Sequence, residues 1–116
     1  MQADESALRR YVSELNERNF AVLDEVVADF VSMGPGENLT RYEYRQLILN
    51  RIERWPDYHV TVQEATSIGD EVILRWSVRG TDKETGESMS EQRVSGYRFL
   101  EGRIVEVRDV ADRDEA

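Results

Sequence analysis

The sequence predicts an α+β fold, a cone-shaped α+β barrel in which three N-terminal helices pack on a strongly curved antiparallel sheet. Two observations predict it. Apolar residues recur every three or four positions in the first half of the chain, and they alternate with polar residues in the second half. Helices followed by strands are the order of a segregated α+β domain. With 116 residues and no linker, we expect one domain over residues 1–116, with a frayed tail over residues 113–116.

The helices are indicated by apolar stripes and by the residues that flank them. One stripe predicts a helix over residues 4–18, and a shorter stripe predicts a second helix over residues 20–28. The stretch SMGPGEN then favours a loop, and residues 29–33 before it are predicted as a short edge strand. The third helix begins with a capping-box spacing at residues 40–43 and ends at Pro56.

Alternation of apolar and polar residues predicts four strands in the second half of the chain. They are expected over residues 58–68, 71–80, 92–100 and 102–112, with turns between them. Helices on one face of such a meander enclose an interior that can hold a pocket. Ten apolar residues are predicted to be mostly buried: Leu8, Val12, Leu15, Leu23, Val27, Leu47, Ile48, Val72, Leu74 and Ile104.

Composition argues against several classes of function. The formal net charge is −9 and the 15 basic residues are scattered among acids, which argues against nucleic-acid binding. There is no cysteine and His59 is the single histidine, so we expect no metal site and no cofactor. The N-terminus does not resemble a signal peptide, and no apolar run approaches the roughly 20 residues that span a bilayer. We therefore expect a cytoplasmic protein with no membrane partner.

The last predicted strand carries a carboxylate along its apolar side. Strict alternation places Asp109 with Val105 and Val107 and opposite Ile104, unless a bulge intervenes. Either the strand has left the sheet there and Asp109 is in water, or its carboxylate lies inside the cone. Burial would raise its pKa, as a general acid/base near neutrality requires. An arginine that reaches the carboxylate would reverse this shift, and the candidates are Arg75, Arg98 and Arg108.

Three stretches covering nearly the whole chain resemble, in order and spacing, the SnoaL-like polyketide cyclase branch of the nuclear transport factor two-like superfamily: RRYVSELNERNFAVLDEVVAD, RWPDYHVTVQEATSIGDEVILRWSVRG and GYRFLEGRIVEVRDVAD. The resemblance implies that Asp109, directly after Arg108, is the catalytic acid/base, and together with the alternation it predicts that the Asp109 carboxylate lies inside the cone, near Tyr11. The histidine that the cyclases carry on the preceding strand is replaced here by Ser95. In the related ketosteroid isomerases a helix-one tyrosine donates to the developing oxyanion, and Tyr11 stands at that place. Gly34 stands where those isomerases carry their general base.

The wall of the expected pocket follows from the residues that face the interior of the cone. Ser95 and Tyr97 share one face of their strand, and Trp76 lies on the inner face of the neighbouring strand. Tyr44 of the third helix and Met33 before the loop complete the wall that we expect.

Two functions from different classes remain open. The first is a cofactor-free cyclase, isomerase or lyase that acts on a hydrophobic carbonyl compound, with Asp109 transferring the proton and Tyr11 stabilising an enolate oxygen. The second is a non-catalytic ligand-binding or dimerisation domain of the same fold. The partner that we expect is a small hydrophobic molecule. The resemblance also implies a homodimer through the outer face of the sheet, where Ile73 and Leu100 are apolar.

Overall fold

The computed structural model describes residues 5–34 and 36–110. The predicted frayed tail lies outside this part of the chain. Within the described part, no helix is long and apolar enough to cross a membrane. Three helices and six strands follow one another in this order: α1 (Glu5–Asn16), α2 (Val22–Val26), β1 (Val27–Gly34), β2 (Glu37–Thr40), α3 (Arg41–Arg54), β3 (His59–Ile68), β4 (Glu71–Thr81), β5 (Ser88–Leu100) and β6 (Arg103–Asp109).

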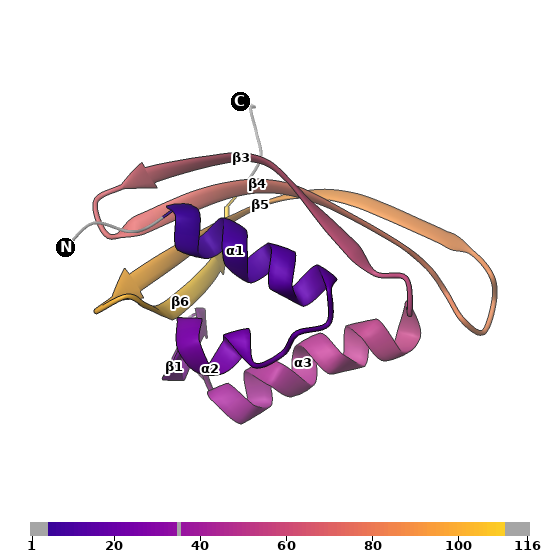
Figure 1. The fold of residues 1–116 in the computed structure, drawn as a ribbon, viewed down its shortest axis with the longest axis horizontal. Coiled ribbons are helices and arrows are strands. Elements are labelled where there is room, and N and C mark those ends of the chain that lie inside the picture. Colours follow the sequence, from indigo (N-terminus) through magenta and orange to yellow (C-terminus); the bar gives the residue numbers. More distant parts are fainter. Residues whose placement is uncertain (1–4, 35, 111–116) are drawn as a thin grey trace.

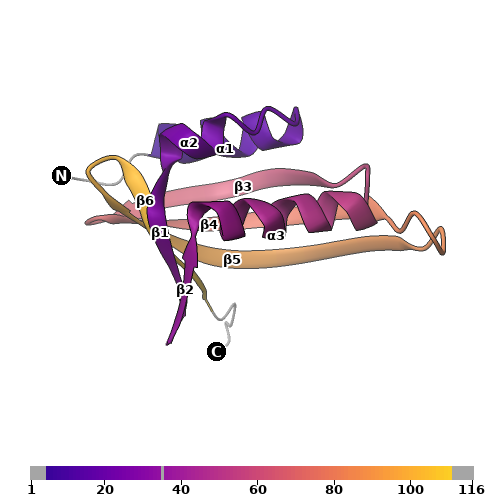
Figure 2. The same cartoon turned by 90° about the horizontal axis from the view of Figure 1, so that it is seen from below.

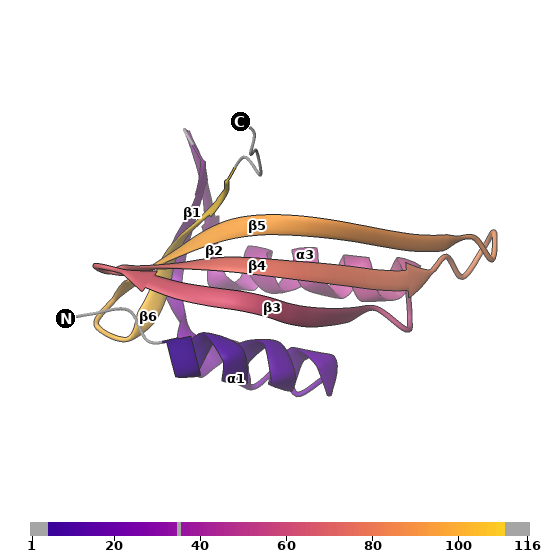
Figure 3. The same ribbon diagram turned by 90° about the horizontal axis from the view of Figure 1, so that it is seen from above.

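All six strands belong to one curved sheet in the order β2-β1-β6-β5-β4-β3. Neighbouring strands are antiparallel except β1 and β6, which run parallel. The long strands β3, β4 and β5 arch over α1 and α3, which cover the concave face of the sheet (Figure 1). From below, β1, β2 and β6 cross one end of the long strands (Figure 2), and the view from above shows the same arrangement (Figure 3). The predicted fold class is confirmed, although the sheet is open and does not close into a barrel.

The segment around the glycine-rich loop differs from the prediction. β1 extends over Val27–Gly34 and lies between β2 and β6, so it is an interior strand and not a short edge strand over residues 29–33. β2 was not predicted, because its four residues are too few to show alternation. Gly34 and Gly36 have φ angles of 138° and 74°, which favour glycine and allow the reversal between the two strands.

The helices follow the stripes and caps of the sequence. At the start of α3, Thr40 Oγ1 accepts a hydrogen bond from the Glu43 backbone N–H at 3.1 Å. Glu43 Oε1 accepts one from the Thr40 N–H at 2.9 Å, so the predicted capping box is present. The second helix is shorter than predicted because Val27 already has extended backbone angles and begins β1.

The core lies between the helices and the concave face of the sheet. Eight of the ten predicted core residues are buried: Leu8, Val12, Leu23, Val27, Ile48, Val72, Leu74 and Ile104. The other two, Leu15 and Leu47, are half-buried because both line a cavity. The cone is therefore packed at its closed end and hollow between α1, α3 and the strands.

Candidate ligand pocket

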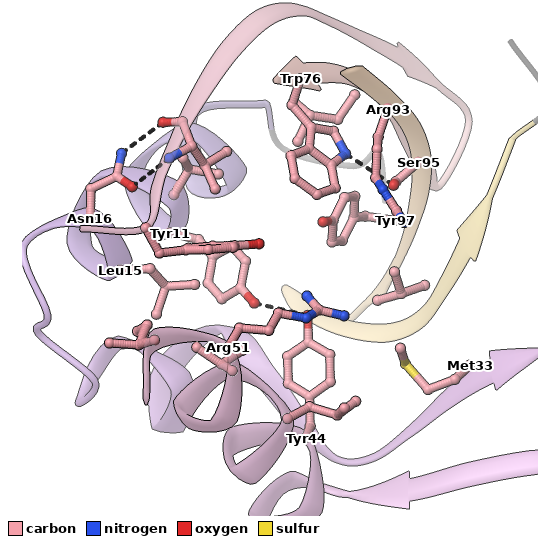
Figure 4. Close-up of a pocket in the computed structure, with 18 of the residues that line it drawn as sticks. Tyr11, Leu15, Asn16, Met33, Tyr44, Arg51, Trp76, Arg93, Ser95 and Tyr97 are labelled. Atoms are coloured by element: carbon pink, nitrogen blue, oxygen red, sulfur yellow. Dashed lines mark hydrogen bonds between the residues drawn. The ribbon is translucent and has the colours of Figure 1, made fainter. Parts of the chain in front are cut away.

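A cavity of about 180 Å³ lies between α1, α3 and the concave face of the sheet (Figure 4). Its wall is largely apolar and aromatic, with side chains from both helices and from five strands. All seven residues that the sequence singled out lie on this wall: Tyr11, Met33, Tyr44, Trp76, Ser95, Tyr97 and Asp109. The structure brings these residues together, while their roles in catalysis and binding stay predictions.

Three phenols form what we call the floor of the cavity: Tyr11, Tyr44 and Tyr97. Their exposed fractions are 3%, 6% and 8%. The hydroxyls of Tyr11 and Tyr44 lie 2.8 Å apart and share a hydrogen bond in which either can donate (Figure 4). Burial raises the pKa of all three phenols above the ordinary tyrosine value. They are therefore neutral hydrogen-bond donors near neutral pH.

The floor keeps hydrogen-bonding capacity for a ligand. Each phenol has one hydroxyl hydrogen, so whichever of Tyr11 and Tyr44 accepts within the pair keeps its own hydrogen for another acceptor. The Tyr97 hydroxyl has no hydrogen-bond partner among the described residues. A buried polar group without a partner costs about 1 to 3 kcal/mol. An oxygen atom of a ligand at the floor would therefore be stabilised.

Trp76 and Ser95 form the part of the wall contributed by β4 and β5. Trp76 Nε1 donates to Ser95 Oγ at 3.0 Å, and both residues are buried. This hydrogen bond holds the indole ring in place as an apolar surface of the cavity. Ser95 is also the register partner of Asp109 on β6. Ser95 thus lies opposite Asp109 on the neighbouring strand, where it offers a hydroxyl group.

The carboxylate of Asp109 lies at the opening of the cavity and not inside the cone. Its side chain is 81% exposed, so the predicted burial is wrong. β6 ends at this residue, where a carboxylate keeps its hydration and avoids the high cost of an apolar interior. The arginine within 4 Å is Arg93, whose Nη1 lies 3.9 Å from Oδ1. The three arginines considered from the sequence pair with other acids. Arg75 pairs with Glu64. Arg98 pairs with Glu106, and Arg108 pairs with Glu71.

A β-bulge determines which residues of β6 face the cavity. The register between β5 and β6 shifts so that Val105 is an extra residue. Ile104 therefore faces the same concave side as Val107 and Asp109, and it is fully buried. The predicted alternation, which places Ile104 and Asp109 on opposite faces of the strand, is wrong, although Asp109 still lines the cavity.

Three arginines on the cavity wall were not among the predicted site residues: Arg18, Arg51 and Arg93. Arg51 follows Tyr44 by two turns of α3, and Arg93 precedes Ser95 by one pleat of β5. These periodicities are present in the sequence and identify both residues once the stripes are known to face a cavity. Arg51, Arg93 and Asp109 are exposed, and together they form what we call the mouth. Within residues 5–34 and 36–110, no group of three or more His, Cys, Asp or Glu side chains is arranged so that it could hold a metal ion.

The end of α1 is tied to the sheet, which fixes the shape of the cavity. The Asn16 amide donates to the Val60 carbonyl at 2.8 Å and accepts from the Val60 N–H at 2.9 Å (Figure 4). Arg18, with a φ of 66°, donates to the carbonyls of Pro56 and Tyr58 at 2.9 and 2.8 Å. The side of the cavity next to α1 is therefore held by hydrogen bonds as well as by packing.

The fold defines the class: an NTF2-like protein of unknown function from Exiguobacterium superposes with a TM-score of 0.75 at 19% identity, covering 90% of this chain and 96% of that chain. Within that class, the family model described as SnoaL-like polyketide cyclase matches residues 5–115. The chain belongs to the SnoaL-like polyketide cyclase family.

Solved structures agree with the fold. A SnoaL-like polyketide cyclase from Agrobacterium tumefaciens superposes with a TM-score of 0.85 at 21% identity, covering 95% of this chain and 91% of that chain. A proposed polyketide cyclase from Acidithiobacillus ferrooxidans gives 0.80 at 22% identity, covering 93% and 87%. IdmH, a proposed polyketide cyclase from Streptomyces antibioticus, gives 0.79 at 22% identity, covering 92% and 90%. No curated protein matches the chain. At these identities the likeness shows the fold alone.

Proposed function

We propose that this protein binds a small apolar carbonyl compound and catalyses an acid–base reaction of the cyclase or isomerase type. One observation carries the proposal: a single cavity combines neutral phenol donors at its floor with a carboxylate at its mouth. Its volume of about 180 Å³ exceeds the ~150 Å³ that accommodates a benzene-sized molecule, which favours a ligand of one or two rings. Membership of the SnoaL-like family supports the type of reaction.

In this mechanism Asp109 takes a proton from the carbon next to the carbonyl group. The electron pair of the broken C–H bond forms an enolate, whose negative charge rests mainly on oxygen. Tyr11 or Tyr44 donates a hydrogen bond to that oxygen, and burial strengthens the donation. In an isomerisation Asp109 returns the proton to another carbon. In a cyclisation the enolate carbon bonds to a second carbonyl carbon, and the proton passes to the new alkoxide.

Deuterium exchange into a model ketone tests this mechanism. The protein is mixed with 2-tetralone in D₂O, and loss of the signals next to the carbonyl is followed by proton NMR. We expect the protein to accelerate exchange and Asp109→Asn to lower the protein-dependent rate about 100-fold, as for loss of a general base. Asp70→Asn removes an exposed carboxylate in the turn between β3 and β4, outside the cavity, and should leave the rate unchanged.

A second function, ligand binding without catalysis, is favoured by the exposure of Asp109 and its ion pair with Arg93. A carboxylate in water at a strand end is also what a pocket without chemistry would show. The same samples distinguish the two functions. If 2-tetralone shifts the NMR signals of cavity residues but exchanges no faster than the free ketone, the protein binds and does not catalyse.

We further propose that two copies pair through the outer face of the sheet. The strand register places Ile68, Ile73 and Leu100 on this face, and the first and last are each 63% exposed. Sedimentation should show a dimer at micromolar concentrations, and Ile73→Arg should dissociate it because it places a charge in the contact. Ser13→Arg, on the exposed side of α1, is the matched control. A monomer at every concentration would exclude this pairing.

A further inference from the structure

Arg51 is a cation on the cavity wall whose charge is not used inside the described part of the protein. Its side chain extends from α3 across the cavity toward the strands (Figure 4). Among the described residues, no carboxylate lies within 4 Å of its guanidinium, and no group accepts a hydrogen bond from it. An arginine placed in this way has five N–H donors available to a ligand.

The other two arginines on the wall are engaged. Arg93 Nε donates to Glu91 at 3.1 Å, and its Nη1 lies 3.9 Å from the Asp109 carboxylate. Arg18 donates to four backbone carbonyls, those of Leu15, Asn16, Pro56 and Tyr58. Arg18 is a structural residue and Arg93 is part of an ion pair, which leaves Arg51 as the arginine on this wall for recognition of a ligand.

The charge of the cavity is opposite to that of the whole chain. The protein carries a formal net charge of −9. The residues that line the cavity nevertheless include three arginines and one carboxylate, Asp109. Such a local excess of positive charge in a partly enclosed site favours an anionic ligand over a neutral or cationic one.

The floor supplies a second polar group close to Arg51. Burial raises the pKa of the Tyr97 phenol, and the positive charge of Arg51 opposes that increase. The positive charge of Arg51 also opposes the increase in the pKa of Tyr11 and Tyr44, so it acts on all three phenols of the floor. Tyr97 is 8% exposed, and its hydroxyl has no hydrogen-bond partner among the described residues. A ligand oxygen bound beside Arg51 would supply that partner.

We propose that the ligand of this cavity carries a carboxylate, which Arg51 binds with help from the Tyr97 hydroxyl, while the apolar body of the ligand fills the cavity. A guanidinium offers two parallel N–H donors that match the two oxygens of a carboxylate. The ligand is therefore a small, ring-containing carboxylic acid in its anionic form. This inference rests on the proposed function, because it names the ligand class of the same cavity.

The test compares the binding of 2-naphthoate and 2-naphthamide, two probes of similar shape of which the first is charged. Titration calorimetry at pH 7 and low salt should show the wild-type protein binding naphthoate about tenfold more tightly, because bonds between charged groups are the stronger ones. Arg51→Gln should remove this preference without changing the affinity for naphthamide. Arg51 is exposed, so the variant should unfold at the wild-type temperature.

Two further variants test whether the preference for naphthoate depends on side chains inside the cavity or on any positive charge of the same helix. Arg45→Gln removes a guanidinium from the same helix, but Arg45 lies outside the cavity over the Phe20 ring, so the preference should remain. Tyr97→Phe keeps the ring and removes the hydroxyl. We expect it to weaken naphthoate binding several-fold, up to about tenfold, and to affect naphthamide less.

Three results would overturn the carboxylate assignment. These are equal binding of both probes by the wild-type protein, an unchanged preference in Arg51→Gln, and binding of neither probe by a protein that still deuterates 2-tetralone. In each case the proposed function is judged separately, by the exchange rate. Conversely, a preference for naphthoate that depends on Arg51 would support the assignment even if 2-tetralone is not deuterated.

Discussion

The floor and the mouth of the cavity are built in opposite ways. The floor consists of three neutral phenols, each less than 10% exposed, and two of them satisfy each other by a hydrogen bond of 2.8 Å. The mouth consists of three charged, exposed side chains. Arg51 has no ion pair among the described residues, and the other two residues make a pair 3.9 Å long. The floor therefore belongs to the core of the protein, while the mouth contributes little to folding.

For Arg51 and Asp109, the position along the helix or strand explains the difference from the floor. Tyr11, Tyr44 and Tyr97 come from parts of α1, α3 and β5 that other elements cover. Arg51 lies in the last turn of α3, and Asp109 is the last residue of β6. Side chains at the ends of elements keep their hydration, so charges are stable there. Substitutions at the floor should consequently change stability, and substitutions at the mouth should change ligand binding.

The largest expected effect is the loss of a floor ring. Tyr97→Ala removes a buried aromatic side chain and should lower the free energy of unfolding by about 3 to 5 kcal/mol, as other aromatic-to-alanine changes in cores do. Asp109→Ala, on the neighbouring strand, should change it by less than about 0.5 kcal/mol. Urea denaturation measures both values. Similar losses of unfolding free energy in the two variants would mean that the floor and the mouth contribute equally to stability.

The next largest effect is a loss of stability at alkaline pH. Burial raises the folded-state pKa of the floor phenols, so above their ordinary value of 10.0 the folded protein keeps protons that the unfolded chain releases. Stability must therefore fall as pH rises, by about 1.4 kcal/mol per pH unit for each phenol. Tyr97→Phe should reduce this slope by the contribution of one phenol, about 1.4 kcal/mol per pH unit. Tyr42→Phe, which alters a tyrosine that is 69% exposed and outside the floor, is the control variant.

The hydrogen bond between the two paired floor phenols has a smaller expected effect. Tyr11→Phe leaves the Tyr44 hydroxyl without its partner and should cost about 1 kcal/mol of unfolding free energy. If the hydroxyls stabilise each other, the double variant Tyr11→Phe/Tyr44→Phe should cost clearly less than the sum of the single variants. Strictly additive losses would show that each hydroxyl has another partner. Chemical denaturation of the four proteins completes the cycle.

The fold could be predicted from the sequence because periodicity reports directly which face of an element is buried. The stripe of α1 and the alternation of β4 both correspond to observed buried faces. The bulge at Val105 could not be predicted, since an extra residue in β6 is decided by its pairing with β5 and not by local sequence. β2 is too short to show a period, so the interior position of β1 was missed as well.

For the candidate site, the sequence predicts which way a side chain points better than it predicts how deeply that side chain is buried. Tyr97 and Ser95 share a face by alternation, and the structure places both on the cavity wall. How deeply the Asp109 side chain is buried depends on how far α1 and α3 cover the end of β6. That is a property of the tertiary structure, and the local sequence does not report it. Arg51 was missed because charged residues on a helix are usually solvated, and only the position of Tyr44 shows which way it points.

The smallest expected effect is that of the ion pair at the mouth. Arg93 and Asp109 have exposed fractions of 44% and 81%, and their charged atoms lie 3.9 Å apart. Exposed pairs of this kind contribute about 0.2 to 1 kcal/mol, and salt screens them. A double-mutant cycle with Arg93→Gln and Asp109→Asn, measured by urea denaturation, should give a coupling below about 0.5 kcal/mol that disappears in about 1 M NaCl. A coupling above about 1.5 kcal/mol would show that the mouth is part of the fold after all. The weak coupling that we expect would leave the Asp109 carboxylate free to act on a ligand at little cost in stability.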